Sequence, residues 1–455
     1  MKKVLATLLV LVLTFSAFAG GSTESTTTTN TAVGTTNNIV TATDGKTQFS
    51  GTVNVGVITS LSSTMAATNG WYLAALEASA SVVNAHGGID GKQLVYSLYD
   101  PESDAGTVKQ RLTDIKNSGC IAAIYSAGDA LSPAAAQWAA ENDFPVFITS
   151  NISTEVTLGN YSKNAFNMSK NAWGLAKILA LYCVGEEGCK NFCFVGTDGA
   201  ATIDAENFLI YEGQKIDPEF KMLASYRVNW NDIEYSNIIS AVSSLKPEMV
   251  LQQGGGPNFV SFCQQASIFD LFSSCDVYND LVTSASTNQP LIEGDEFPYG
   301  HTHGVFSYPF WDYSLITGEI KEYDDAFYAT ETAKKNGYYP DDNFIINYFV
   351  TKCIEYAVEA CVEKGIDYTK DSNAFSEAIS EVHFSDSFGE HYFRTDIDNQ
   401  FTANMFYGTS YEDSNYAGVA ICKEYVTYTA EEYLPTADEM KAWGSTHGFD
   451  VSRFN

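Results

Sequence analysis

Residues 83–104, VNAHGGIDGKQLVYSLYDPESD, hold in one run the parts that decide the fold. An apolar segment ends on Gly87 and Gly88, and glycine readily adopts the left-handed conformation that closes a helix. Asp90 and Gly91 then turn the chain into an alternating apolar segment, and the acids of PESD suit the positive start of a following helix. The stretch therefore predicts a helix, a tight turn, a strand and a second helix in succession.

The same alternation of strand and helix extends through most of the chain. Short apolar runs predict strands, and longer runs with small and apolar residues predict helices. Strands are expected at 52–59, 93–100, 120–126 and 144–150, and helices at 71–85, 105–119 and 133–143. The rhythm continues after residue 170, and such repeats predict doubly wound parallel sheets.

A chain of 455 residues is too long for one core, so we predict an α/β fold of two doubly wound lobes joined by a hinge. The first lobe is expected to comprise 51–168 plus 305–387, and the second 169–304 plus 388–455. The chain is then expected to cross between the lobes near 166–172, 300–310 and 385–392. Each lobe is therefore built from two separate segments.

The N-terminus, MKKVLATLLVLVLTFSAFAGG, has the pattern of a secretory signal peptide over residues 1–19. Lys2 and Lys3 form the charged start, a short apolar run follows, and an A-x-A cleavage pattern ends at Ala19. The apolar run is too short for a permanent transmembrane helix. We therefore expect a soluble protein, exported to the periplasm or the extracellular space, with no direct membrane insertion. Residues 20–50 are rich in Thr, Ser, Asn and Gly, which predicts a disordered leader.

The formal net charge of −31 excludes some classes of partner. Such a charge repels nucleic acid and anionic membrane surfaces. It indicates either a solvated acidic surface, typical of an exported protein, or a cationic ligand. Among the nine cysteines, Cys183, Cys189 and Cys193 lie close together in the sequence. They form either a small disulfide loop or reduced thiols, since their spacing does not suit zinc.

Motifs of the common enzyme classes are missing from the sequence. There is no G-x-S-x-G, no H-E-x-x-H and no G-x-G-x-x-G after a strand, and the glycines at 254–256 are not followed by the Lys of a phosphate loop. His301 and His303 form an H-x-H pair, but the sequence places no third metal ligand beside them. We therefore predict no enzymatic activity, no cofactor and no metal site.

Three stretches carry a resemblance to a known family: VNVGVITSLS, the run at 83–104, and FPVFITSNIS. Together they resemble the periplasmic solute-binding proteins of the leucine/isoleucine/valine-binding type, over about 51–430. The resemblance implies a type I fold that captures a small solute between its lobes and delivers it to the membrane permease of an ABC importer, working as a monomer. The alternative is an extracellular sensing module that works with a separate membrane receptor.

The resemblance also implies where the ligand binds. Open α/β sheets bind ligands outside the carboxyl ends of their strands, and amino-acid binders of this type hold the ligand carboxylate with hydroxyl and backbone N–H groups of two first-lobe loops. These loops follow the strands at 120–126 and 144–150. The matching positions, with one from the loop at 60–70, are Thr68, Ser126, Ala127, Gly128, Asp129, Asn151 and Ser153.

The chain departs from the family pattern at several of these positions. Asp129 lies near a place where the family usually has Ser, so it either repels a ligand carboxylate or caps the helix at 133–143. Ala201 lies near the place of a stacking Tyr. Asp280 is the candidate partner for a ligand ammonium, or else a surface acid. The predicted solute is therefore a small polar compound, an amino acid or a relative, with an amide or a nucleobase as the alternative.

Overall fold

The computed structural model describes residues 35–39, 47–62, 69–229 and 232–454. The chain divides into a short unit, Met1–Ala32, and a large unit, Val33–Asn455, which carries every described element. The predicted signal peptide at 1–19 lies outside the described residues. No helix within the described ranges is long and apolar enough to cross a membrane.

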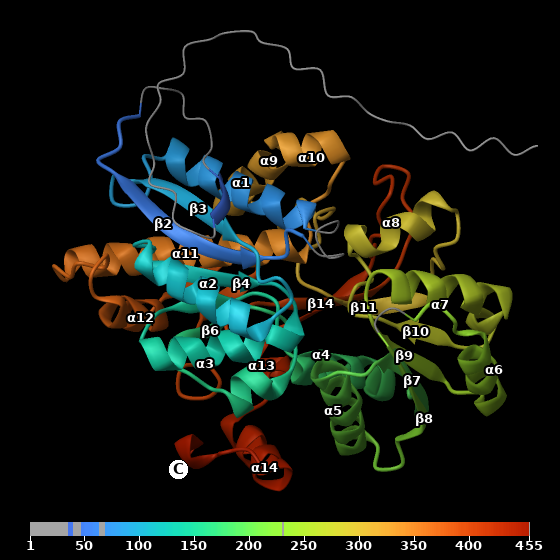
Figure 1. Ribbon diagram of the computed structural model, residues 1–455. Helices are drawn as coiled ribbons and strands as arrows, with labels where there is room; N and C mark the ends of the chain where they lie inside the picture. The colour runs from blue at the N-terminus through green and yellow to red at the C-terminus, as the bar shows by residue number, and fades with distance from the viewer. Residues whose placement is uncertain (1–34, 40–46, 63–68, 230–231, 455) are drawn as a thin grey trace, which may run out of the picture. The chain divides into compact units, whose positions relative to one another are not determined.

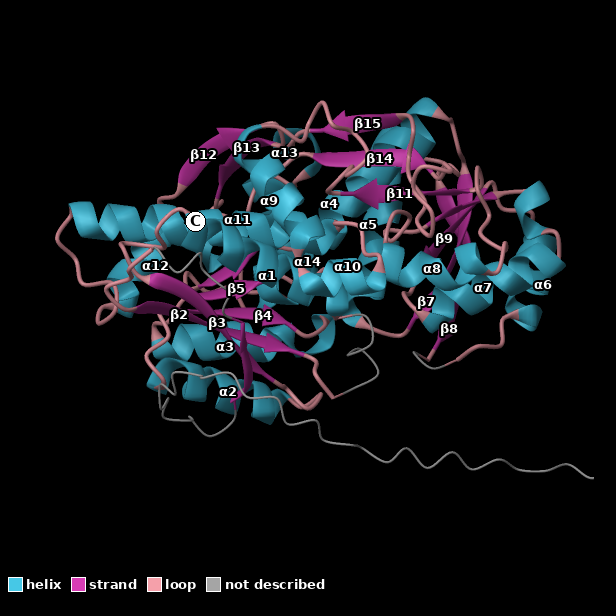
Figure 2. Ribbon diagram, turned by 90° about the horizontal axis from the view of Figure 1, so that it is seen from above, coloured by secondary structure: helices cyan, strands magenta, loops and turns pink. Residues whose placement is uncertain are grey.

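The first sheet contains six strands in the order β1-β3-β2-β4-β5-β6. Its strands are β1 (Thr35–Ile39), β2 (Thr52–Thr59), β3 (Gln93–Tyr99), β4 (Ala122–Ser126), β5 (Val146–Ile148) and β6 (Ala165–Asn167). All neighbours pair in parallel except β1 and β3. Helices α2 (Ala105–Asn117) and α3 (Ser132–Asn142) cover one face, and α1 (Gly70–Ala85) and α11 (Asp342–Glu363) cover the other (Figure 2).

The outer strand β1 corrects one prediction. Residues 20–50 were expected to form a disordered leader, which is wrong for Thr35–Ile39, because these residues pair antiparallel with β3. Asn38 lies opposite Ser97, and Ile39 packs against the core. The physical reason is the exposed edge of β3, whose backbone groups need partners that even a polar strand can supply.

Residues 83–104 have the predicted form: the end of α1, a tight turn, β3 and the cap of α2. Gly88 has φ +76°, and a Cβ atom there would lie 2.0 Å from the carbonyl oxygen of Lys92, so a side chain does not fit. After β3, the Asp104 side chain accepts a hydrogen bond of 2.7 Å from the backbone N–H of Thr107 and caps α2. The succession of helix, turn, strand and helix is confirmed.

The second sheet contains seven strands in the order β15-β14-β11-β10-β9-β7-β8. Its strands are β7 (Asn191–Thr197), β8 (Lys221–Val228), β9 (Met249–Gln253), β10 (Asp276–Tyr278), β11 (Thr302–Phe306), β14 (Met405–Thr409) and β15 (Tyr425–Tyr428). The five from β7 to β11 are parallel, and β14 and β15 extend the sheet in antiparallel fashion. Helices α4 (Ala172–Leu179) and α5 (Ala200–Ile216) pack on one face, and α6 (Ser236–Leu245) and α7 (Pro257–Ile268) on the other.

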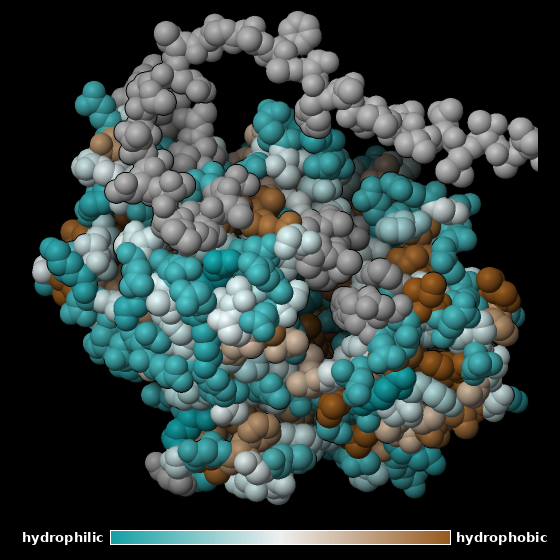
Figure 3. All heavy atoms as spheres, viewed as in Figure 1, coloured by the Kyte–Doolittle hydropathy of each residue, from teal (hydrophilic) through white to brown (hydrophobic). Residues whose placement is uncertain are grey.

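These two sheets confirm the predicted fold of two α/β lobes. The remaining helices are α8 (Ala285–Glu293), α9 (Gly318–Ala329), α10 (Glu331–Asn336), α12 (Ser372–Ser380), α13 (Ala430–Tyr433) and α14 (Ala437–His447). On the face shown in Figure 3, hydrophilic residues predominate over α2 and α3, and apolar residues gather over the helices of the second sheet. Among the exposed apolar residues are Ile268, at the end of α7, and Phe269.

The chain passes from the first sheet to the second after β6, returns after β11, and passes again before β14. The last passage was expected at 385–392, and this is wrong. Those residues belong to the hairpin of β12 (His383–Asp386) and β13 (Gly389–Tyr392). Phe388 and Phe401 pack in the same core as α11, and the Asn167 side chain beside them donates to Gln400, so this segment lies against the first sheet. Aromatic side chains of the hairpin favour the core beside α11 over solvent.

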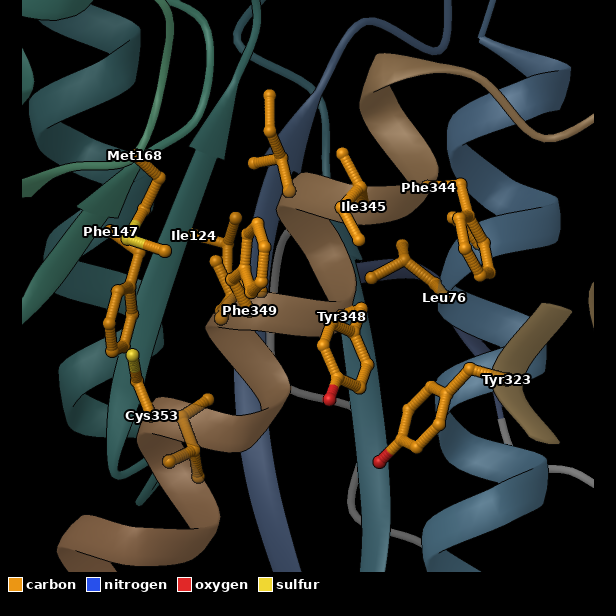
Figure 4. Packing of buried hydrophobic residues seen from close by; sticks show 14 of the residues in the cluster. Leu76, Ile124, Phe147, Met168, Tyr323, Phe344, Ile345, Tyr348, Phe349 and Cys353 are labelled. Carbon is orange, nitrogen blue, oxygen red and sulfur yellow. The ribbon is translucent and has the colours of Figure 1, made fainter. Parts of the chain in front are cut away.

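The core of the first lobe is built around α11 (Figure 4). Its side chains Phe344, Tyr348 and Phe349 point toward α1, α9 and the strands, where Leu76 and Ile124 meet them. Figure 1 shows the same arrangement as an orange helix beside blue strands, so distant segments of the chain share one core. Burying one large apolar side chain contributes about 1.5–3 kcal/mol to stability. Because α11 buries several of them, it is a main source of stability for the first lobe.

We predict that the start of α11 makes stability depend on pH. The Asp341 carboxylate caps the helix, and burial, with the charge of Asp342 adding to it, raises the pKa of Asp341 to about 7. The ordinary value is 3.8, so between these values the folded state binds a proton that the unfolded state has lost. The free energy of unfolding should therefore fall as pH rises through that window.

Asp341→Asn keeps a good capping side chain but cannot titrate. Urea unfolding of both proteins at about pH 5 and about pH 8 measures the change, and the variant should lose less stability than the wild type. Equal losses would show that Asp341 does not titrate in this range. Asp324, whose pKa burial raises to about 6, remains in both proteins and does not affect the comparison.

Candidate functional site

The first candidate loops lie at the carboxyl ends of β4 and β5. Because the two strands are parallel neighbours, the loops that follow them meet at one edge of the sheet. The backbone N–H of Gly128 donates to the Ser150 hydroxyl at 3.0 Å, and the Tyr125 hydroxyl donates to the Gly128 carbonyl at 2.7 Å. Gly128 has φ +95°, which favours glycine there. The structure therefore brings the two predicted loops together.

Asp129 holds the second loop. One of its carboxylate oxygens accepts hydrogen bonds from the backbone N–H groups of Ile152, at 2.7 Å, and Ser153, at 3.0 Å. No side chain caps the start of α3, so the expectation that Asp129 caps this helix is wrong. A carboxylate of the protein occupies N–H groups in the loop where the family resemblance placed a ligand carboxylate.

Asn151 and Ser153 fasten the loop from inside. The amide oxygen of Asn151 accepts from the Ser132 hydroxyl at 2.8 Å and from the Ser153 hydroxyl at 3.3 Å. Both Asn151 and Ser153 are buried. Their side chains therefore join the loop to the start of α3. Ser126 and Ala127 are half-buried at the end of β4, and Thr68 lies outside the described residues.

Tyr72, on α1, is a residue that the sequence did not indicate. Its side chain is 3% exposed, and its hydroxyl makes no hydrogen bond to any residue that the structure describes. Burial raises the pKa of Tyr72, and the hydroxyls of Ser126 and Thr149 lie near it. A buried hydroxyl without a partner costs about 1–3 kcal/mol, so it marks a place where a polar partner would be favourable.

The second lobe reaches this loop through α5. Its carboxylate Asp204 accepts hydrogen bonds from the backbone N–H of Thr154, at 2.7 Å, and from the Thr154 hydroxyl, at 2.8 Å. Burial raises the pKa of Asp204, and the nearby charge of Asp129 adds to the shift. Ala201, half-buried, lies one turn earlier on the same helix. The loop after β5 is thus held by one carboxylate from each lobe.

A small cavity lies at the carboxyl ends of β9, β10 and β11. Its volume is about 30 Å³, and its polar lining comes from Gln253, Asn279 and Asp280. A space of this size holds water but no larger solute. Asp280 lies partly buried at its edge, and burial raises the pKa of this carboxyl, although Lys170 opposes the shift. Asp280 therefore lies beside Lys170, where the chain crosses between the lobes.

Lys170, which is 7% exposed, binds the chain segments that cross between the lobes. Its ammonium donates to the Asp342 carboxylate at 2.5 Å, to the Asp280 carbonyl at 2.9 Å and to the Val305 carbonyl at 3.4 Å. The other oxygen of Asp342 accepts from the backbone N–H of Ser307 at 2.7 Å. Burial alone would lower the pKa of Lys170, but the surrounding acids raise it. One ion pair therefore joins two chain crossings and α11.

The histidine pair and the cysteines have structural partners. His303 contacts the Thr409 hydroxyl at 2.9 Å, and His301 lies 3.3 Å from Asp276. Within the described ranges, no three His, Cys, Asp or Glu side chains are placed to hold a metal ion. Cys183, Cys189 and Cys193 are free thiols, so the disulfide loop suggested by their spacing does not form. Burial in the second-lobe core favours the protonated thiols and raises their pKa values.

Comparisons with known proteins agree with this architecture. The family model for periplasmic binding proteins matches residues 52–414. No curated protein sequence matches the chain. A solved periplasmic binding protein from Burkholderia mallei is 18% identical, with a TM-score of 0.70, and the match covers 85% of this chain and 97% of that one.

Two further solved structures have the same fold. The Leucine-, isoleucine-, valine-, threonine-, and alanine-binding protein from Brucella ovis, in a closed conformation, is 14% identical with a TM-score of 0.71, covering 85% of this chain and 97% of that one. An ABC-transporter solute-binding protein from R. palustris, in complex with benzoate, is 15% identical with a TM-score of 0.67, covering 84% of this chain and 98% of that one. At these identities the likeness confirms the fold.

The ion pair of Lys170 generates a prediction for stability. Lys170→Met should lower the free energy of unfolding by about 3–5 kcal/mol, because it leaves the Asp342 carboxylate without its partner. The double variant Lys170→Met/Asp342→Asn should recover part of this loss, since the amide oxygen can still accept from Ser307 without carrying a charge. Urea unfolding measures both. An equal loss in the single and double variants would show that the unpaired charge is not the cause.

Proposed function

The chain belongs to the periplasmic binding protein family, and on this premise we propose that it is an exported receptor that captures a small polar solute between its lobes and delivers it to an ABC-type importer. The observation that carries the proposal is the loop at 149–154, which follows β5 in the first lobe and is bound by Asp204 of the second. A solute near this loop would contact groups from both lobes.

The chain crossings support a receptor that opens and closes. The two sheets have separate cores on their outer faces and are linked by short segments after β6, after β11 and before β14. Hinge closure around a ligand is the typical motion of such two-lobed proteins. In the proposed receptor the ion pair of Lys170 and Asp342 holds the crossings together. The hydrogen bonds from Thr154 to Asp204 form when the lobes close.

Cellular location and partners follow from the same proposal. The N-terminal pattern at 1–19 fits a cleavable signal peptide, so the receptor works outside the cytoplasm. Its partners are a small-molecule solute and the membrane permease of an importer, and it acts as a monomer. Binding and release at the permease require no chemical step, so no catalytic residue is assigned.

The test is a thermal-shift screen of the purified protein against amino acids, amines, amides, nucleobases and small carboxylates. A solute at a hundred times its dissociation constant stabilises the protein by about 2.7 kcal/mol, which raises the melting temperature measurably. We expect at least one class to produce this shift. A screen in which no compound shifts the melting temperature would contradict the proposed function.

For any solute found, Asp204→Ala should weaken binding by about tenfold or more, because the closed form loses two hydrogen bonds to a carboxylate. Glu219→Ala is the matched control, since Glu219 is an exposed acid that precedes β8, at the edge of the sheet opposite the candidate loops. Titration calorimetry measures both affinities. Equal affinity in Asp204→Ala and wild type would show that the contact to Thr154 is not part of the bound form.

A further inference from the structure

We infer that the solute presents a cationic amino or amidino group, and no carboxylate, to the first-lobe loops, so that its chemical class is a small organic amine. The inference rests on the proposed function and names the solute class of the same site. It depends on Asp129, Asp204 and Tyr72, and each supplies a separate step.

The first step is that the anion-binding groups of the loop are already occupied. The backbone N–H groups of Ile152 and Ser153 donate to Asp129, and the N–H and hydroxyl of Thr154 donate to Asp204. An incoming carboxylate would have to displace one of these side chains and then remain beside both negative charges. Neighbouring negative charges repel each other, and partial burial strengthens the repulsion.

The second step is that Asp129 and Asp204 keep negative charges that no cation of the protein pairs. Asp129 and Asp204 each use one carboxylate oxygen in these bonds, and the second oxygen of each makes no hydrogen bond within the described part of the chain. No Lys, Arg or His side chain among the described residues forms an ion pair with either acid. Partly buried carboxylates without a counterion favour a cationic partner.

The third step is independent of the acids. The Tyr72 hydroxyl is buried beside the hydroxyls of Thr149 and of Ser126, in the strand that leads to Asp129, and forms no well-aligned hydrogen bond within the described residues. A hydroxyl can accept a hydrogen bond from an N–H group. An amine carries several N–H donors, so it can pair with a carboxylate and still donate to a hydroxyl. The net charge of −31 adds a long-range attraction for such a cation.

The experiment uses three pairs in which the amine lacks only the carboxylate of the amino acid: agmatine and arginine, cadaverine and lysine, tyramine and tyrosine. A fourth pair, benzamidine and benzoate, exchanges the cation for a carboxylate on the same ring. Titration calorimetry on the full mature protein measures each affinity. For the wild type we expect the amine or amidine of at least one pair to bind about tenfold or more tightly than its carboxylate partner.

Asp129→Ser should reverse this preference. It removes a negative charge and frees the N–H groups of Ile152 and Ser153, so the carboxylate member should gain about tenfold and the amine should lose affinity. Asp129→Asn is the second variant, because its amide oxygen can still hold the loop if the Ser variant does not fold. Glu219→Gln removes an exposed acid that precedes β8, at the opposite edge of the sheet, and is the matched control, expected to leave both affinities unchanged.

The outcomes separate this inference from the proposed function. Carboxylates that bind the wild type as tightly as their amine partners, or an unchanged preference in both Asp129 variants, would overturn the inference and leave the receptor function standing. Binding of neutral solutes alone would do the same. If no compound of any class binds, the proposed function itself is contradicted, and the inference falls with it.

Discussion

The backbone N–H groups at 152–154 must have partners, and the way the protein supplies them determines the character of the site. Buried or partly buried N–H groups are nearly always paired. Here the partners are two carboxylates, Asp129 from the adjacent loop and Asp204 from the other lobe. The loop is thereby fixed in shape, linked across the lobes and made negative. The inference that the solute is a cation rests on this negative charge.

Lys170 supplies the counterpart at the crossings. A buried ammonium needs several acceptors, and it finds them on Asp342, Asp280 and Val305. These residues come from α11 and from two strand ends of the second sheet, so one side chain determines where the lobes join. In the proposed receptor this is the region about which the two lobes open and close.

The parts of the fold that the sequence predicted are those controlled by neighbouring residues. The helix end at Gly88 and the cap at Asp104 depend on backbone geometry within a few residues, so a local pattern was sufficient. The edge strand β1 and the late crossing before β14 depend on distant partners. The polar residues of β1 lack the apolar alternation that predicts a strand. The aromatic residues on both sides of the crossing before β14 do not indicate which core they join.

The adjacency of the candidate loops was predictable from the sequence, but the contacts within them were not. The loops after β4 and β5 are adjacent, as parallel strand order requires. However, the bond from Asp204 to Thr154 joins residues fifty positions apart, and no spacing rule indicates it. Asp129 departs from the family pattern in the sequence, but its partners, the N–H groups of the next loop, depend on the fold. The buried hydroxyl of Tyr72 likewise has no signature in the sequence.

The central claim is that carboxylates of the protein occupy the loop's N–H groups before any solute binds. Hydrogen exchange of the backbone amides of Ile152, Ser153 and Thr154 in the solute-free protein measures this most directly. The account predicts slow exchange at all three amides in the wild type, faster exchange at Ile152 and Ser153 in Asp129→Ser, and faster exchange at Thr154 in Asp204→Ala. Exchange at the rate of an unstructured peptide in the wild type would contradict it.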